Sequence, residues 1–187
     1  MMNKLNLVLG NSSSPNQSSF MLLMEEISLQ SCKSTIEWIV EANFAEEKPE
    51  SLNLMICSPG GDLNAGFALV DVMKGSTIPV NTIGIGEIAS AGLLIFLAGT
   101  KGKRILTPNT AILSHQYSWG SYGKHHELLA VAKEFDMISS RLIAHYKKTT
   151  GLNETKVKEL LLPAHDIWLS AKEAKEYGIC DQIKELY

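Results

Sequence analysis

Three side chains of this sequence have the types that nucleophilic catalysis requires. Ser90 stands among small residues in the segment 86–92 (GEIASAG), His115 follows a short apolar run, and Asp166 lies further along the chain. A serine hydroxyl is a weak nucleophile at neutral pH, so it needs a base within hydrogen-bond reach, and that base needs an acceptor to orient it. The sequence therefore offers Ser90, His115 and Asp166 as nucleophile, base and orienting acid.

Each of the three also has an ordinary structural interpretation. Ser90 would serve as an N-cap that satisfies free N–H groups of the following helix. His115 would be a core histidine bonded to the backbone, and Asp166 a loop carboxylate that stabilises the next turn. Because proteins contain many serines, histidines and aspartates, the residue types alone leave both interpretations open.

Two backbone positions would stabilise the negative charge of an attacked carbonyl. Gly61 closes the turn at 58–61 (SPGG), where no side chain shields its N–H, and Ala91 opens the helix after Ser90. A helix N-terminus favours negative charge. We therefore expect the N–H groups of Gly61 and Ala91 to form an oxyanion hole, the alternative for the glycine pair being a tight turn.

The elements that must position these residues alternate in type. The patterns predict strands over 52–57, 80–84, 104–106 and 111–113, helices over 30–44, 63–74, 91–98 and 124–148, and a short helix capped by Ser170 that stops at Gly178; residues 20–27 fit either type. Repeated strand–helix–strand units predict an α/β fold. A crevice at the edge where the strands end would gather the candidate catalytic residues.

The long helix expected over about 124–148 has a continuous apolar seam. Its members recur at a spacing of three and four residues: Leu128, Val131, Phe135, Ile138, Leu142 and His145. Two interpretations remain open, since such a helix either covers its own sheet or projects and packs against another subunit.

Composition excludes several classes of function. The 187 residues are expected to form one domain, and a net charge of −3 without a basic stripe argues against nucleic-acid binding. No apolar run approaches the roughly 18 residues that span a bilayer, and no signal peptide is evident. Residues 10–19 are polar and rich in turn formers, which predicts a flexible arm.

Cysteines, histidines and tryptophans give little sign of a metal or redox site. Cys32, Cys57 and Cys180 show no CxxC or metal spacing and are expected to be buried thiols in a reducing compartment, a catalytic cysteine being the alternative. No metal or cofactor is expected. Surface positions are expected for His125 and His126, a packing role for His145, and core or interface positions for Trp38, Trp119 and Trp168.

Five sequence blocks together resemble the proteolytic subunit of the Clp protease. They are residues 58–61, 86–92, 98–104, 115–116 and 166–178, in the family's order and near its spacing. The match is good over about 52–185 and weaker over 20–51, and residues 1–19 do not match. The resemblance implies one peptidase domain over 1–187 with a crotonase-like fold of repeated β-β-α units. It implies Ser90 as nucleophile, His115 as base, Asp166 as its orienter, and Gly61 and Ala91 as oxyanion donors.

The same resemblance implies an assembly. Residues 118–148 match the projecting handle through which two heptameric rings face each other, enclosing a chamber where unfolded proteins or peptides are cut. A Clp-type unfolding ATPase or a paralogous subunit is the implied partner. Because no signal peptide or membrane-spanning run is evident, the expected location is the cytoplasm or an organelle matrix, or an infected host cell for a divergent phage-encoded copy.

Departures from the family pattern fall at Ala91 (usually Met), Tyr117 (usually Pro), and Ala164 and His165 (usually Asp-Arg, which links the rings). Two alternatives remain: an accessory, non-catalytic subunit of such a particle, which the changed ring contacts leave open, and an acyl-CoA enzyme of the crotonase type, which would share the fold.

Overall fold

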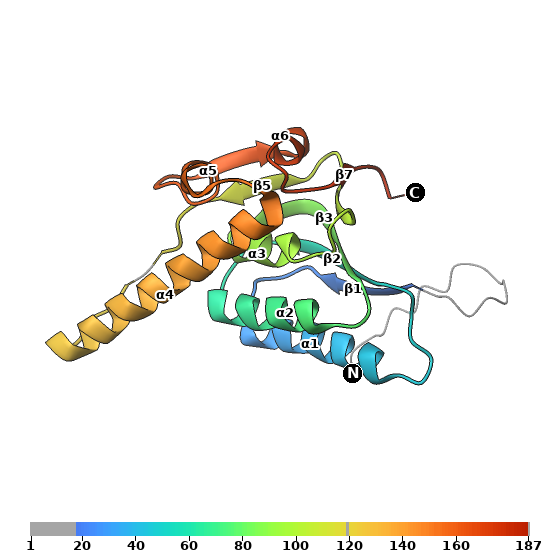
Figure 1. Cartoon of the computed structure of the whole chain (residues 1–187), viewed down its shortest axis with the longest axis horizontal. Coiled ribbons are helices and arrows are strands. Elements are labelled where there is room, and N and C mark those ends of the chain that lie inside the picture. Colours follow the sequence, from blue (N-terminus) through green and yellow to red (C-terminus); the bar gives the residue numbers. More distant parts are fainter. Residues whose placement is uncertain (1–17, 119, 187) are drawn as a thin grey trace.

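The computed structural model describes residues 18–118 and 120–186 and has a mixed α/β architecture built on a seven-stranded sheet (Figure 1). In chain order the elements are β1 (Ser19–Leu23), α1 (Leu29–Phe44), β2 (Leu52–Ser58), α2 (Leu63–Gly75), β3 (Val80–Ala89), α3 (Ala91–Leu97), β4 (Arg104–Leu106), β5 (Ala111–Ser114), α4 (His125–Thr150), α5 (Glu154–Leu160), β6 (Ile167–Ser170), α6 (Ala171–Glu176) and β7 (Gln182–Ile183). The predicted α/β class is confirmed.

The sheet branches at β3. Strands β1, β2, β3, β4 and β7 pair in that order and run parallel, while β5 also pairs with β3 and β6 runs antiparallel to β5. The first half of β3 pairs with β4 and its last three residues pair with β5. The prediction that this strand ends at Gly84 was wrong, because Gly86, with φ 63°, bends the strand without ending it.

Helix α3 forms the centre of the core. All seven of its residues are buried, and it contacts α2, α4 and the strands β2, β3 and β5. Helices α1 and α2 lie side by side along the sheet (Figure 1). A helix that is apolar all round belongs in an interior, so the helix that begins directly after Ser90 is held from every side.

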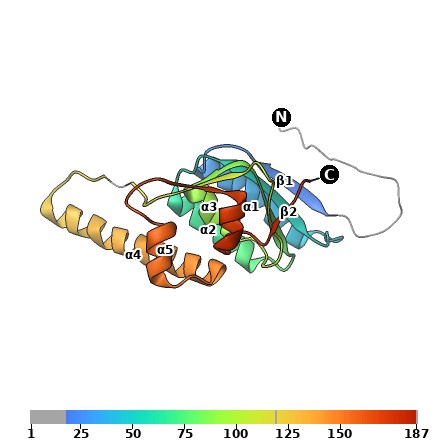
Figure 2. The same ribbon diagram turned by 90° about the horizontal axis from the view of Figure 1, so that it is seen from above.

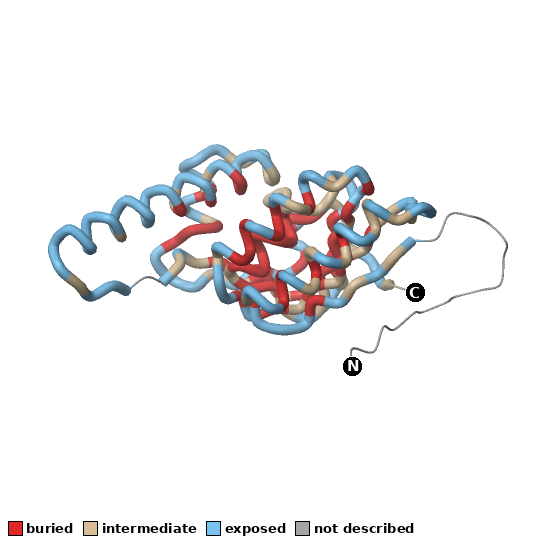
Figure 3. The backbone as a smooth tube through the Cα atoms, turned by 90° about the horizontal axis from the view of Figure 1, so that it is seen from below, coloured by how far each residue is buried: buried red, intermediate tan, exposed pale blue. Residues whose placement is uncertain are grey.

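The two halves of helix α4 each fit a different one of the two interpretations of its apolar seam. Its first half extends away from the rest of the chain and is exposed along its length (Figures 2 and 3). Leu128 and Phe135 of the seam are 42% and 41% exposed, whereas Ile138, Leu142 and His145 are buried. The second half therefore covers its own domain, and the first half presents an apolar seam that stays largely exposed in the described chain.

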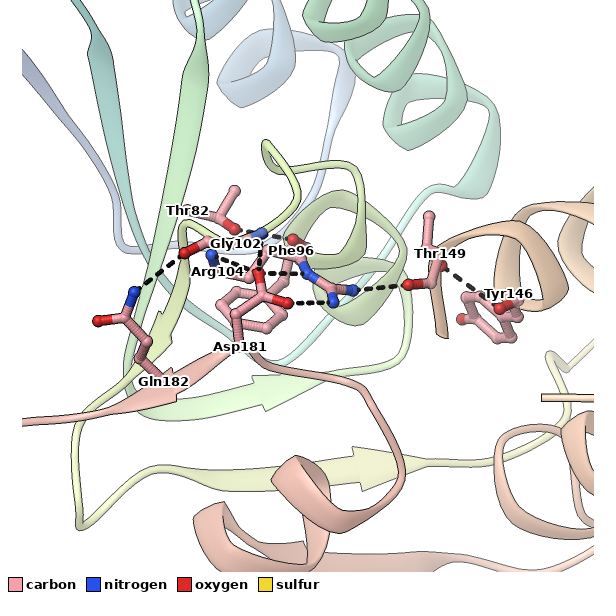
Figure 4. Close-up of polar contacts among 8 residues, drawn as sticks. All are labelled: Thr82, Phe96, Gly102, Arg104, Tyr146, Thr149, Asp181 and Gln182. Carbon is pink, nitrogen blue, oxygen red and sulfur yellow. Dashed lines mark hydrogen bonds and ion pairs between the residues drawn. The ribbon is translucent and has the colours of Figure 1, made fainter. Parts of the chain in front are cut away.

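A buried ion pair fastens the far end of α4 to the sheet (Figure 4). The guanidinium of Arg104, in β4, donates to both carboxylate oxygens of Asp181 at 2.9 and 2.6 Å, and also to the carbonyl of Thr149 at 2.9 Å. Burial alone would raise the pKa of Asp181, but the hydrogen bonds and charge of Arg104 outweigh it and lower that pKa. This cluster joins β4, the approach to β7 and the last turn of α4.

The short elements and the cysteines outside the sheet centre agree only partly with the sequence-based expectations. The ambiguous segment 20–27 begins as β1, and the elements α5, β6 and β7 were missed. Among the cysteines, Cys32 and Cys180 are buried and Cys57 is half-buried. Burial raises the pKa of Cys32 and of Cys180 to about 11, so neither is a thiolate at neutral pH.

The aromatic and N-terminal expectations are met in part. Trp38 is half-buried and donates to the hydroxyl of Ser19, but Trp168 is 56% exposed and is not a core residue. His125 and His126 are exposed, as expected. Trp119 and residues 1–17 of the expected arm lie outside the described residues, while Ser19 already belongs to β1.

Candidate active site

The register of β3 against β5 sets Ser90 beside the segment that carries His115. Ala89, the last residue of β3, pairs with Leu113, and the N–H of Ser90 donates to the Leu113 carbonyl at 3.0 Å. Strand β5 ends at Ser114. Ser90 and His115 therefore both follow the carboxyl ends of neighbouring parallel strands, which is where open α/β sheets form their sites.

Strand β6 brings Asp166 to the same edge because it runs antiparallel to β5. Ser114 pairs with Ile167, the first residue of β6, so the preceding Asp166 continues the register opposite His115. Nδ1 of His115 lies 3.6 Å from Oδ1 of Asp166, just beyond hydrogen-bond length. The Asp166 side chain is 64% exposed and makes no hydrogen bond to another described residue. It does not stabilise the following turn, so that interpretation is wrong.

Ser90 has an unusual backbone conformation directly before α3. It is the one non-glycine residue with positive φ in the described ranges, with φ 51° and ψ −117°. Although it precedes α3, its side chain makes no capping hydrogen bond. The N-cap interpretation is therefore wrong, and such stored strain clusters at functional positions.

The glycine turn after β2 packs directly on Ser90. A Cβ at Gly60 would lie 2.7 Å from the Ser90 Cβ and 3.0 Å from the Ala89 carbonyl oxygen, and Gly60 also has φ 97°. The buried hydroxyl of Ser58 accepts from the Gly60 N–H at 3.2 Å and holds the turn. Only glycine at this position permits the close approach.

The N–H of Gly61 points away from the neighbouring segment of the same chain, which contains Ile27. Ile27 pairs with this residue through the residues on either side: the Ile27 N–H donates to the Gly60 carbonyl at 2.7 Å, and the Asp62 N–H donates to the Ile27 carbonyl at 2.8 Å. Because N–H groups alternate in extended chain, that of Gly61 faces the other side. Gly61 lines the same pocket as Ser90. The N–H of Ala91, in the first turn of α3, has no partner within that helix.

A pocket of about 500 Å³ collects these groups. It is lined by Pro59, Gly61, Asp62, Leu63, Asn64, Ser90, His115, Tyr117, Ser118 and Ile138. Ser90 and His115 thus face one cavity, while Asp166 approaches His115 from outside its lining. The His115 side chain is 27% exposed and has no backbone hydrogen bond among the described residues, so the core-histidine interpretation is wrong. No hydrogen bond joins the Ser90 hydroxyl to His115 there either.

Residues 18–118 and 120–186 contain no set of side chains arranged to bind a metal ion. No group of three or more His, Cys, Asp or Glu side chains there could hold an ion. Over the same residues, no helix is both long and apolar enough to cross a bilayer.

Sequence reasoning missed two residues that hold the site together. The buried Ser114 hydroxyl donates to the Leu161 carbonyl at 2.6 Å, and the Tyr117 hydroxyl bonds to α4. A serine that ends an apolar strand gives no signal of its own. Tyr117 stood out only as a departure from the family's proline.

Comparisons with known proteins identify a family and relatives for this chain. The family model for Clp protease matches residues 12–186. An ATP-dependent Clp protease proteolytic subunit from Oltmannsiellopsis viridis is 38% identical over 139 residues, which cover 74% of this chain and 70% of that protein. A protein of the same name from Chlorella vulgaris is 37% identical over 139 residues, covering 74% and 68%. The chain therefore belongs to the Clp protease family, and its α/β fold is the crotonase-like fold of that family.

Proposed function

We propose that this chain is a serine endopeptidase subunit that hydrolyses peptides and unfolded proteins through Ser90, His115 and Asp166. The observation that carries the proposal is the convergence of a strained serine, a histidine and an aspartate at the ends of β3, β5 and β6. Membership of the Clp protease family supports the same reaction class.

The proton path follows from the orientation of the imidazole. Its Nδ1 faces the Asp166 carboxylate, so closure of this pair would place the proton on Nδ1 and leave Nε2 to act as base toward the serine. In the proposed reaction the Ser90 oxygen attacks a peptide carbonyl while His115 takes the hydroxyl proton. His115 then protonates the leaving amine, and a water activated by His115 hydrolyses the ester.

The oxyanion of each tetrahedral intermediate is proposed to lie between the N–H groups of Gly61 and Ala91. Both donors belong to rigid backbone, the first beside the Ile27 bridge and the second at the start of a fully buried helix. Preorganised donors of this kind need no reorganisation when charge develops. Typical losses on removing one such donor are about 10²- to 10³-fold in kcat.

A second candidate function is a non-catalytic subunit of a Clp-like particle. The missing hydrogen bond between Ser90 and His115 and the 3.6 Å separation of His115 from Asp166 favour it. Catalytic hydrogen bonds are often long in the absence of substrate, and this favours the first candidate.

Reaction with a fluorophosphonate probe separates the two candidates. Wild-type chain should be labelled, Ser90→Ala should not, and Ser34→Ala, which removes an exposed hydroxyl on α1, should label like wild type. Particle size is measured on the same samples, so that a failure to assemble is seen directly. Equal labelling of wild type and Ser90→Ala contradicts the proposed nucleophile, and an assembled, unlabelled wild type supports the non-catalytic subunit.

The assembly is proposed from the same features. The uncovered seam on the first half of α4 fits a handle that packs against a second ring, and heptameric rings would close a chamber around the pocket. The names of the two relatives include ATP dependence, so we propose an unfolding ATPase or a paralogous subunit as partner. The free cysteines suit a reducing compartment such as cytoplasm or an organelle matrix.

A further inference from the structure

The segment that carries His115 runs beyond the sheet. Strand β5 ends at Ser114, and residues 115–118 pair with no strand. Among the described residues, the one polar partner recorded for the imidazole is the Asp166 carboxylate, at 3.6 Å. The position of His115 therefore depends on how its neighbours in the chain are anchored.

Two anchors on one side tie this segment to the approach to β6. The Ser114 hydroxyl donates to the Leu161 carbonyl at 2.6 Å, and the Gln116 N–H donates to the Pro163 carbonyl at 2.9 Å. Both bonds hold the residues before and after His115 to the chain that leads into β6. Neither bond involves the His115 imidazole.

Tyr117 supplies a further anchor. Side chains alternate along extended chain, and His115 and Tyr117 both line the pocket. The Tyr117 hydroxyl lies 2.9 Å from the Phe135 carbonyl oxygen and 3.3 Å from the Ser139 hydroxyl, and its ring centroid lies 5.1 Å from that of Phe135. Tyr117 thus ties the His115 segment to α4.

The two sets of anchors act on different motions. Bonds from Ser114 and Gln116 tie the segment to the chain that leads into β6, and a segment tied along one edge can still rotate about its own axis. Rotation would swing the imidazole relative to Ser90 and Asp166. The Tyr117 hydroxyl is bonded to α4 instead, and this second attachment opposes that rotation. A misplacement of about 1 Å is enough to cost about 10²-fold in rate.

We propose that Tyr117 is a positioning residue that sets the orientation of His115 through its hydroxyl bond to α4. The inference rests on the proposed function, because it assigns a role in placing the base. It adds a residue whose role is exerted through the base His115. The role depends on the hydroxyl, so the change Tyr117→Phe, which keeps the ring against Phe135, is the informative one.

The experiment compares wild type, Tyr117→Phe and Tyr122→Phe. Tyr122 is a matched control because its side chain is fully exposed and its hydroxyl has no partner in the described chain. Three quantities are measured well below the melting temperature: amide hydrogen exchange over residues 114–118, the rate of fluorophosphonate labelling, and kcat and KM for a fluorogenic peptide. Exchange reports on the segment independently of activity.

Tyr117→Phe should speed exchange of the segment and lower both labelling rate and kcat by about 5- to 20-fold, with KM within about twofold. Tyr122→Phe should match wild type. Unchanged exchange in Tyr117→Phe overturns the inference, and so does faster exchange with unchanged labelling and kcat. A rise in KM alone also overturns it, because that marks a binding role. If wild type is not labelled at all, the proposed function fails, and exchange still decides whether Tyr117 holds the segment.

Discussion

Nδ1 of His115 lies 3.6 Å from Oδ1 of Asp166, a separation that is set by the antiparallel register of β5 and β6. The strands bring the two residues opposite each other, but the pair stops just short of a hydrogen bond. A carboxylate at that place can select the imidazole tautomer with a proton on Nδ1 as soon as the pair closes.

Replacement of Asp166 by asparagine should therefore lower kcat strongly. An amide can donate to Nδ1 and favour the tautomer that leaves no base facing Ser90, and a comparable change in a serine protease costs about 10⁴-fold. We expect a loss of about 10²- to 10⁴-fold in peptide hydrolysis with little change in the free energy of unfolding, since Asp166 is 64% exposed. Steady-state kinetics beside the exposed control Asp71→Asn measures this. Equal kcat in the two variants contradicts the assigned role.

Gly60→Ala should damage the site through backbone contact alone. The added methyl would lie 2.7 Å from the Ser90 Cβ, at a φ of 97° that side-chain-bearing residues rarely adopt. We expect a loss of about 1 to 3 kcal/mol in the free energy of unfolding and slower fluorophosphonate labelling of Ser90.

Gly75→Ala is the matched control for this change. No atom lies within 4 Å of a Cβ at Gly75, and its φ is not positive. Alanine there, at the end of α2, should leave the labelling rate unchanged and the stability equal or slightly higher. Similar labelling of the Gly60 and Gly75 variants would show that the turn does not constrain Ser90.

The parts of the fold that the sequence predicts well are those governed by local pattern. Helix α2 repeats apolar residues at helical spacing, and α1 shows the same period less completely, so their positions follow from the period. Strand β6 was missed because its four residues run directly into the capping box at Ser170, and α5 because only Val157 of its seven residues is buried. Such short elements are determined by their partners, which a single sequence does not show.

The site was predicted by residue type and family resemblance, and its geometry needed the structure. Neither source revealed that Ser90 has positive φ, because most residues with that conformation are glycine. The anchoring roles of Ser114 and Tyr117 depend on the carbonyls of Leu161 and Phe135, which are distant in sequence. Backbone acceptors carry no sequence signature, so these roles were beyond prediction.

Ser114→Ala should destabilise the protein although it removes a single oxygen atom. The hydroxyl is 2% exposed and donates to the Leu161 carbonyl at 2.6 Å, which the change would leave without this donor. Losing a buried bond of this kind costs about 1 to 3 kcal/mol. Urea unfolding at fixed protomer concentration should show that loss for Ser114→Ala and less than about 0.5 kcal/mol for the exposed Ser34→Ala. Equal midpoints for both variants would mean that the Ser114 bond contributes nothing net.

Stability should fall on mild acidification because of His145. This residue is 5% exposed; its Nε2 lies 3.0 Å from the Leu94 carbonyl oxygen and its Nδ1 lies 3.2 Å from the Lys74 ammonium. Lysine can only donate, so Nδ1 accepts and Nε2–H donates, which fixes the neutral imidazole as a single tautomer. Burial, and then the charge of Lys74, lower the pKa of His145 from 6.5 to about 4, with a smaller contribution from Lys148.

The direction of the effect follows from proton counting. Between pH 6.5 and 4 the unfolded chain binds a proton at this position and the folded chain does not, so the free energy of unfolding decreases as pH falls through that window. The decrease is of the order of 3 kcal/mol by pH 4. The ion pair of Asp181 does not affect this window. Because folding lowers the pKa of Asp181, its contribution to the free energy of unfolding is lost only below pH 3.8. His145→Gln keeps a donor for the Leu94 carbonyl and cannot be protonated, so urea unfolding from pH 7 to 4 should lose most of the slope seen in wild type. An identical slope in both proteins would assign the acid sensitivity to other groups.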